Sequence, residues 1–306
     1  MRVAVLFTDG VGVGPRDDTT NPLARGEYLL SQFADGSGTP LPGGGQRYDV
    51  DTTFGVPGRP QSASNQTAIL TATPAPRTIG RHVLGYPNAA LKEILATHSI
   101  VRRITGAGRT ATFANAYPVP YLEALGLRPR TADSENPWPA RILRRIKPSA
   151  STLAMSAAGV PFRTLEDARA DLGLTPDVDG SMAKRRHLPA PERSPADAAR
   201  VFWRLAADFT LFEHYLADEA GHAQDVEAAT NALATFDAFA RAVIDARPDD
   251  CQVLICSDHG NVEDLSIRSH TRNPVAVLSF GDARFSPPVD VSGVGASALT
   301  ILGVGA

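Results

Sequence analysis

The sequence predicts an α/β protein, a three-layer sandwich in which helices cover both faces of a mostly parallel central sheet. Short, continuous apolar runs, such as "RVAVLFT" at residues 2–8 and "CQVLIC" at residues 251–256, are typical of strands buried on both faces. Segments with apolar residues at helical spacing, such as residues 224–247, separate such runs. Strands that alternate with helices favour parallel pairing through right-handed crossovers.

The other elements are predicted from the same two patterns. Ser194 is a good helix N-cap, and Pro195 suits the first helical position of the segment that follows it. We expect further strands at residues 109–117, 210–218 and 274–281, and helices at residues 23–34, 61–72, 88–98, 194–209 and 295–304.

The middle of the chain, residues 118–193, breaks this alternation. Prolines and arginines are dense there, as in "RPRTADSENPWPARILRRIKPS". We interpret this segment as a small inserted lid, and residues 1–117 and 194–306 as the core domain. A basic lid over an anionic substrate and an ordinary solvated face are both compatible with its composition.

Composition excludes several classes of protein. The 306 residues carry a formal net charge of −3, so no basic field predicts binding to nucleic acid. The apolar run "VAVLF" at residues 3–7 is too short for a secretion signal or a membrane span. Cys251 and Cys256 lie on one predicted strand, where they cannot form an ordinary disulfide, and this favours a reducing, cytoplasmic setting.

Carboxylates and imidazoles gather just after the predicted strands, where open α/β sheets bind ligands. Each of these residues alone is explained by a turn, a cap or a structural histidine. Three Asp and three His together, however, match the ligands of two divalent cations, Mn²⁺ or Zn²⁺. Such a pair of ions, about 3.5–4 Å apart, promotes displacement at phosphorus. The six candidates are Asp9, Asp218, His222, Asp258, His259 and His270.

A nucleophile is available in "PQSASNQTAILTA", where Ser62 lies at or just before a helix N-terminus. The free N–H groups and the helix dipole at such a terminus favour a phosphate. A simple capping role for Ser62 or Ser64 is the alternative. The glycines of "DGVGVGP" do not have the spacing of a dinucleotide fingerprint, because Pro15 and Asp17 occupy the places of its third glycine.

Several blocks in this order resemble the alkaline phosphatase superfamily, and within it the branch of cofactor-independent phosphoglycerate mutase and phosphopentomutase. The blocks are "VAVLFTDGVG", "PQSASNQTAILTA", "YLADEAGHAQD", "CSDHGNVED", "SHTRNPVAVL" and the closing "VSGVGASALTILGV". The resemblance implies an alkaline-phosphatase-like fold with two metal sites, one formed by Asp9, Ser62, Asp258 and His259 and the other by Asp218, His222 and His270. It also implies in-line attack by Ser62 and a phosphoserine intermediate.

Two departures from the mutases favour a hydrolase acting on a small phosphorylated metabolite. Residues 63–66, "ASNQ", lack the acidic and His residues of the glycerate mutases, and the middle segment is short for a domain that retains an intermediate. A phosphomutase, a sulfate or phosphonate hydrolase, a binding module without catalysis and a dinucleotide-binding oxidoreductase are the alternatives. Oligomeric state is not predicted. Candidate substrate contacts are Asn65, Gln66, Asn261 and Arg272.

Overall fold

The centre of the protein, in a computed structural model that describes residues 1–129 and 138–305, is a six-stranded sheet with the order β2-β8-β7-β1-β6-β3. Its strands are β1 (Arg2–Thr8), β2 (Gln46–Val50), β3 (Ala111–Phe113), β6 (Phe209–His214), β7 (Cys251–Cys256) and β8 (Val275–Phe280). Strands β7, β1, β6 and β3 run parallel, whereas β8 is antiparallel to both of its neighbours, β7 and β2. The predicted mostly parallel sheet is confirmed.

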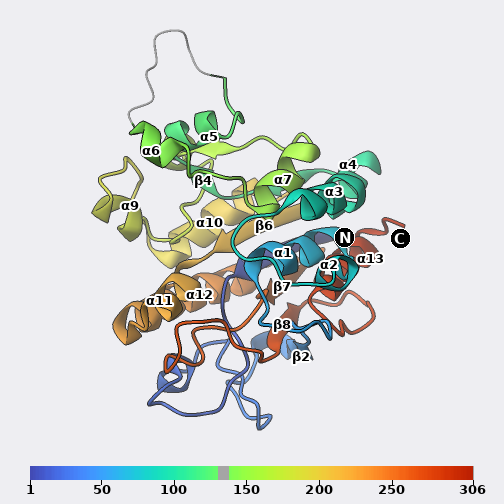
Figure 1. The fold of residues 1–306 in the computed structure, drawn as a ribbon, viewed down its shortest axis with the longest axis vertical. Helices are drawn as coiled ribbons and strands as arrows, with labels where there is room; N and C mark the ends of the chain where they lie inside the picture. Colours follow the sequence, from blue (N-terminus) through green and yellow to red (C-terminus); the bar gives the residue numbers. More distant parts are fainter. Residues whose placement is uncertain (130–137, 306) are drawn as a thin grey trace.

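Helices cover both faces of this sheet, as predicted (Figure 1). Side chains alternate between the faces along β1: Val3 and Val5 join one core, and Ala4 and Leu6 join the other. This is why the run has to be apolar throughout. On one face lie α1 (Ser62–Thr71), α2 (Ala75–Ile79), α3 (Ala89–His98), α4 (Ile100–Gly106), α7 (Ala150–Ala157) and α13 (Ser292–Leu302); on the other lie α10 (Pro195–Leu205), α11 (Leu216–Ala223) and α12 (Val226–Asp245).

The helix predicted at residues 23–34 is wrong. Only a 3₁₀ turn, η1 (Pro22–Arg25), forms, and a loop follows it, with a second turn at η2 (Pro42–Gly44). The apolar residues that suggested a helix are buried beside α12 instead. The N–H of Leu29, for example, donates to the Asp237 carboxylate on α12 at 2.6 Å, in place of a bond within a helix.

The strand predicted at residues 210–218 is too long. β6 ends at His214, and α11 begins at Leu216, so that Asp218 and His222 lie one turn apart on a helix. The apolar pattern crosses this boundary because both elements are buried, and periodicity alone does not separate them.

The middle segment contains two kinds of structure. We define the cap as the described residues of 118–149 and 161–193. Its elements are α5 (Val119–Ala124), α6 (Ala140–Leu143), β5 (Arg163–Thr164), α8 (Leu165–Arg169) and α9 (Ser181–Arg185). The cap is joined to β4 (Ala116–Tyr117) through the pairing of β4 with β5. Between its two parts, α7 returns to the helix layer, where Ala154 and Met155 are buried in the core with α1, α3 and α4. The predicted lid therefore includes a core helix.

The predicted helix N-cap at Ser194 is present, because its hydroxyl accepts from the N–H of Asp197 at 3.1 Å at the start of α10. Cys251 and Cys256 are both free and buried on β7. Among the described residues, the helices lack the combination of length and apolarity needed to cross a bilayer.

Truncating Met155 tests the assignment of α7 to the core. Met155 is fully buried, so Met155→Ala should lower the free energy of unfolding by about 2–5 kcal/mol, measured by chemical denaturation. Ile142→Ala, at an exposed position of α6 in the cap, is the control and should change it little. If Met155→Ala and Ile142→Ala both lowered the free energy of unfolding only slightly, α7 would not contribute to the core.

Candidate metal centre

The topology brings all seven predicted catalytic and metal-binding residues to one edge of the sheet. Asp9 follows β1, and Asp258 and His259 follow β7, at the carboxyl ends of parallel strands. Because β8 is antiparallel, its amino end lies at this same edge, and His270 precedes it. β2 ends here too, opposite Val275, and leads through a loop to Ser62.

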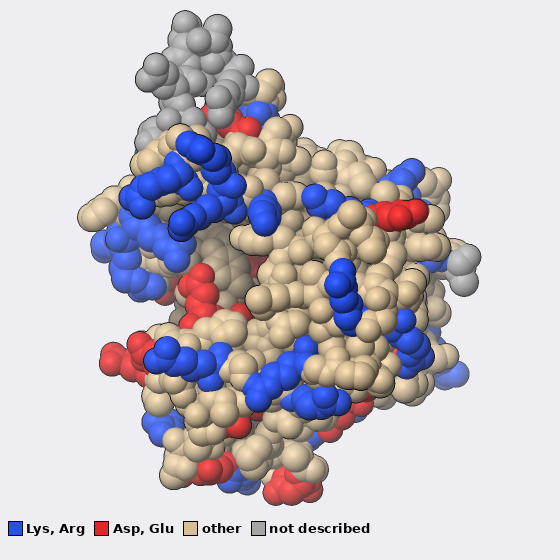
Figure 2. All heavy atoms as spheres, in the orientation of Figure 1, with Lys and Arg blue, Asp and Glu red and all other residues tan. Residues whose placement is uncertain are grey.

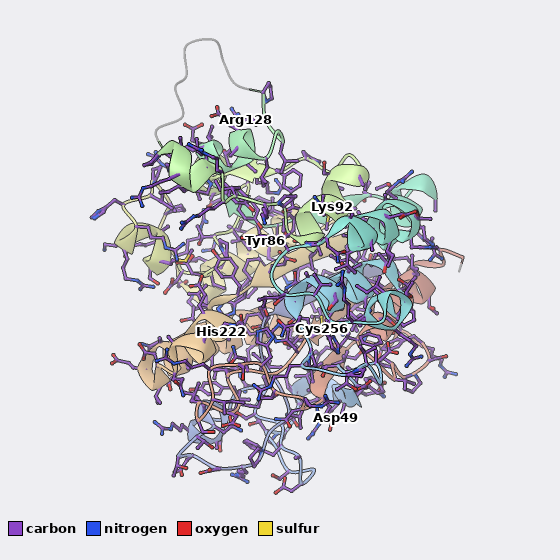
Figure 3. All side chains as sticks on the ribbon, in the orientation of Figure 1. Asp49, Tyr86, Lys92, Arg128, His222 and Cys256 are labelled. Atoms are coloured by element: carbon purple, nitrogen blue, oxygen red, sulfur yellow. The ribbon has the colours of Figure 1, made fainter. Side chains whose placement is uncertain are left out.

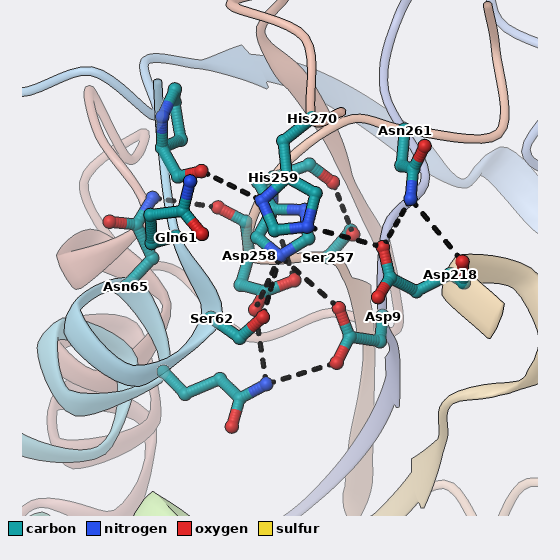
Figure 4. A network of polar contacts seen from close by, with 12 residues as sticks. Asp9, Gln61, Ser62, Asn65, Asp218, Ser257, Asp258, His259, Asn261 and His270 are labelled. Carbon is teal, nitrogen blue, oxygen red and sulfur yellow. Dashed lines mark hydrogen bonds and ion pairs between the residues drawn. The ribbon is translucent and has the colours of Figure 1, made fainter. Parts of the chain in front are cut away.

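One group of side chains converges on the ring of His259 (Figure 4). Its Nε2 lies 2.9 Å from Ser62 Oγ, 3.4 Å from Asp9 Oδ1 and 3.5 Å from Asp258 Oδ2. Asp9 Oδ1 is buried and has no hydrogen bond within the described part of the chain. Several lone pairs therefore face one small volume, an arrangement that is costly without a cation.

A second group surrounds Asp218. Its carboxylate lies 3.3 Å from His222 Nε2 and 3.6 Å from His270 Nε2. His222 Nδ1 lies 2.7 Å from the carbonyl of Arg268, and His270 Nδ1 lies 2.8 Å from that of Pro60. Because a carbonyl only accepts, both Nδ1 atoms carry a proton, and both Nε2 atoms point to the cluster. The hydrogen bond with Asp218 raises the pKa of His222 to about 9, so its Nε2 also carries a proton at pH 7 until a cation displaces it. Histidine ligands of metals are commonly oriented in this way.

The pKa values of Asp9, Asp258, His259 and His270 also suit the binding of a cation. Burial raises the pKa of Asp9 well above its ordinary value, with Asp258 as the next cause, and burial together with Asp218 raises the pKa of Asp258 to about 6. Burial lowers the pKa of His259 and of His270 to about 4, so both rings are neutral at pH 7. Crowded carboxylates beside neutral imidazoles are the ligand set that Zn²⁺ or Mn²⁺ neutralises.

The ligand atoms are also close enough to share an ion. Those of Asp9, Asp258 and His259 lie within 4.8 Å of one another, as do those of Asp218, His259 and His270. The residues therefore fit a pair of cations. The structural grouping differs from the division implied by the resemblance, because His259 lies within reach of both groups and His222 lies outside the set of Asp218, His259 and His270.

Ser62 and Ser64 have different environments at the start of α1. Ser62 is the first residue of the helix and lines a cavity, whereas Ser64 is fully buried. The Ser64 hydroxyl donates to the carbonyl of Gln61 and accepts from the N–H of Val83. Of the two serines, Ser62 is the one placed to react with a ligand in the cavity.

The four predicted substrate contacts have other partners. The Asn65 amide donates to the carbonyls of Thr52 and Asp258, and Asn261 donates to the Asp218 carboxylate at 2.6 Å. Gln66 donates to the carboxylates of Asp9 and Asp258, at 3.1 Å each, while Arg272 is exposed and donates to the carbonyl of Gly58. Asn65, Asn261 and Gln66 thus position the metal-binding candidates, and contact with substrate stays a prediction.

Glu263 is an organising residue that the sequence analysis missed. Its fully buried carboxylate accepts from the N–H groups of Gly12 and Asn261 at 2.9 and 2.8 Å, and from the side chains of Thr271 and Asn273. Gly12 belongs to the loop after β1, and the other three donors belong to the loop between β7 and β8, so that one side chain ties the loop that carries Asp9 to the loop that carries His259 and His270. An acid in the loop "HGNVED" gives no local sign of burial.

The glycines near Asp9 make room for these contacts. A Cβ on Gly12 would collide with the Glu263 carboxylate, and a Cβ on Gly10 would lie 2.6 Å from Asp218 Oδ1. Gly10 also has φ +74°, which a side chain would strain. The glycines of "DGVGVG" thus allow close packing between the loops that carry the predicted metal ligands.

A cavity of about 640 Å³ opens from Ser62 toward the cap, and its lining includes Asp9, Gln66 and Glu213. Glu213, on β6, is a second acid that the sequence analysis missed. It accepts from Ser151 at 2.8 Å, and burial raises its pKa to about 7. A neighbouring cavity of about 650 Å³, lined by Asp177, His214 and residues of α12, contains none of the seven predicted residues.

The fold is that of the alkaline phosphatases. The alkaline phosphatase of the Antarctic bacterium TAB5 superposes with a TM-score of 0.58 and 15% identity, over 100% of this chain and 99% of that one. The PH0037 protein of Pyrococcus horikoshii superposes with a TM-score of 0.57 and 12% identity, over 100% and 97%. The predicted alkaline-phosphatase-like architecture is confirmed.

Part of the sequence also matches known proteins. Residues 196–297 match the model of the Metalloenzyme superfamily. Phosphopentomutases of Helicobacter acinonychis and Helicobacter pylori are 33% and 36% identical over 72 residues, which are 24% of this chain and 17% of each relative. The chain thus spans under a fifth of the length of these relatives. The fold is therefore alkaline-phosphatase-like, and the matched segments are similar to the Metalloenzyme superfamily model and to a part of the phosphopentomutases.

Removing the Glu263 carboxylate should loosen the whole centre. Glu263→Ala leaves buried donors unpaired, each at about 1–3 kcal/mol, so we expect the free energy of unfolding to fall by at least about 3 kcal/mol. Affinity for Mn²⁺ or Zn²⁺, measured by calorimetry, should fall about 10–100-fold.

Asp264→Ala is the matched control, because this neighbouring carboxylate accepts only from Ser266 among the described residues. Glu263→Gln keeps the size of the side chain but loses an acceptor, and should have a smaller effect in the same direction. Wild-type stability and metal affinity in Glu263→Ala would disprove the organising role.

Proposed function

We propose that the protein is a phosphohydrolase, dependent on two divalent metal ions, that cleaves a small phosphate ester with Ser62 as its nucleophile. One observation carries the proposal: the Ser62 hydroxyl, at a helix N-terminus and open to a cavity, lies 2.9 Å from Nε2 of His259, the residue that belongs to both groups of ligand atoms that fit cations. The alkaline-phosphatase-like fold and the match to the Metalloenzyme superfamily model support an enzyme that acts on phosphate esters.

The residues of the chain have defined parts in this reaction. The amide groups in the first turn of α1 face the end of the helix and bind the phosphate oxygens. Ser62 Oγ gives up its proton and forms a bond to phosphorus as the bond to the ester oxygen breaks, and the departing alkoxide takes up a proton to leave as the alcohol. Water then cleaves the phosphoserine, which releases inorganic phosphate and restores the hydroxyl.

Asp9, Asp258 and His259 would hold one cation, and Asp218, His222 and His270 would hold the other. When bound, the cations would supply Lewis-acid neutralisation of the charge on phosphate and on the serine oxygen. Mixed oxygen and nitrogen ligands suit both Mn²⁺ and Zn²⁺. We propose a reducing, cytoplasmic setting, in which the thiols of Cys251 and Cys256 remain free.

A phosphomutase is the second candidate, and the 72-residue match to phosphopentomutases favours it. The hydrolase is preferred because the cavity at Ser62 opens to solvent, where water competes with a second acceptor. The two functions are separated by the product: free phosphate from a hydrolase, or an isomeric phosphate ester, with the phosphate on another hydroxyl, from a mutase.

The two serines of α1 provide a matched test of the nucleophile. With Mn²⁺ or Zn²⁺ added, the wild-type protein should release phosphate from 4-nitrophenyl phosphate, and Ser62→Ala should be slower by at least about a thousandfold. Ser64→Ala removes a hydroxyl of the same helix turn that faces the core, and should retain most of the activity. Full activity in Ser62→Ala would refute the proposal.

Metal content tests the centre separately from turnover. Elemental analysis after equilibrium dialysis should give two ions per chain for the wild type. Asp9→Asn and Asp218→Asn should each bind fewer ions, because each loses a charged ligand of a different group. Wild-type metal content in both variants would place the metals elsewhere.

A further inference from the structure

The cavity above Ser62 is shaped by the cap as much as by the core. Its floor is formed by Phe7, Asp9, Ser62 and Gln66, and its upper walls come from β4, α5, α8 and α9. Figure 2 shows the corresponding hollow between the cap and the core. At about 640 Å³ the cavity has the size of sites that enclose a small organic ligand.

The walls are mainly aromatic and apolar, although Ser149, Thr175, Arg186, Glu213 and Glu219 also line the cavity. The aromatic residues that line the cavity are Tyr86, Tyr117, Tyr121, Trp138 and Tyr215, and the aliphatic ones include Pro118, Leu165, Pro176, Met182 and Leu188. In Figure 3, Tyr86 lies in the region between the cap and the core, above His222. Such walls bind flat apolar groups well.

The central aromatic pair is held in place by its own packing. The rings of Tyr117 and Tyr121 stack with centroids 5.2 Å apart and planes 21° apart, and Tyr117 also packs on Phe113 at 6.0 Å. The Tyr215 hydroxyl contacts Met182 Sδ at 3.9 Å. A ligand ring therefore meets rings that are already ordered, which lowers the entropic cost of binding.

Positive charge in the cavity is sparse. Of the described residues that line it, Arg186 is the only Lys or Arg, and its guanidinium lies 3.9 Å from the carboxylate of Glu219. Figure 2 shows further Lys and Arg side chains on the visible surface of the cap beside the hollow, and Arg128 lies at the end of the cap far from His222 (Figure 3). The cavity thus has a place for one phosphate, at Ser62, and little to hold a second.

Resting on the proposed function, we infer that the substrate is a phosphate monoester whose alcohol carries a flat aromatic ring, packed against Tyr117 and Tyr121. The phosphate lies at Ser62, on the floor of the cavity, and the ring lies against the aromatic wall. This assigns specificity to the cap and the chemistry to the core.

Three esters with the same primary alkyl oxygen as leaving group separate the contributions to specificity: 3-phenylpropyl, 3-cyclohexylpropyl and n-propyl phosphate. In the metal-loaded protein, kcat/KM for the phenyl ester should exceed that for the propyl ester by at least about tenfold. It should also exceed that for the cyclohexyl ester, because stacking adds to the burial of apolar area.

Substitution of the tyrosines tests the wall directly. Tyr121→Leu and Tyr117→Leu keep an apolar side chain but remove its aromatic face, so kcat/KM for the phenyl ester should fall about 2–10-fold, a larger fold-change than for n-propyl phosphate. Tyr48→Leu, whose ring packs on Phe285 away from the cavity, is the matched control. Thermal melting establishes whether each variant is folded. If Tyr117→Leu does not fold, Tyr121→Leu alone is sufficient for the test.

The outcomes distinguish the two proposals. The aromatic specificity would be overturned, and the hydrolase would stand, if phosphate were released from all three esters at equal kcat/KM. The same conclusion would follow if kcat/KM fell equally for the phenyl and propyl esters in the tyrosine variants. No release from any ester by protein that contains two metal ions would refute the hydrolase, and the substrate inference with it.

Discussion

The buried carboxylate of Glu263 is the contact on which the rest of the centre depends. It accepts four hydrogen bonds from two loops, the one after β1 and the one between β7 and β8, and both loops carry predicted ligands. Burial raises its pKa, but donors on both oxygens stabilise the ionised form. Gly12 and Gly260 lack side chains where a Cβ would collide with it, so backbone and carboxylate pack together directly. The loops therefore have little freedom to move apart.

This rigidity explains how three carboxylates are held within a few ångströms of one another. Asp9, Asp218 and Asp258 repel one another, and the protein resists the repulsion with donors from Gln66 and Asn261. The repulsion between these carboxylates is unfavourable without cations, and bound cations would neutralise it. The cap takes no part in this centre; its aromatic residues enclose the space where the organic part of an ester would lie.

The sequence predicted most of the fold and the members of the centre, because strong local patterns carry both. Buried strands such as β1 and β7 require continuous apolar runs, and polar residues directly after them are conspicuous. Glu263 and Glu213 were missed because an acid in a loop or strand gives no local sign of burial. The helix predicted at residues 23–34 was wrong, since its apolar side chains serve a loop packed on α12. The placement of α7 in the core depended on contacts distant in sequence.

By itself, the sequence determined the class of fold, the two cores on either side of the sheet and the residue types available for metal binding. The tertiary structure alone decided how these residues meet. The antiparallel direction of β8 is the clearest case: it puts the residues before the strand, His270 among them, at the edge where the parallel strands end. Strand direction depends on pairing between segments remote in the chain, and the apolar run of β8 is compatible with either direction.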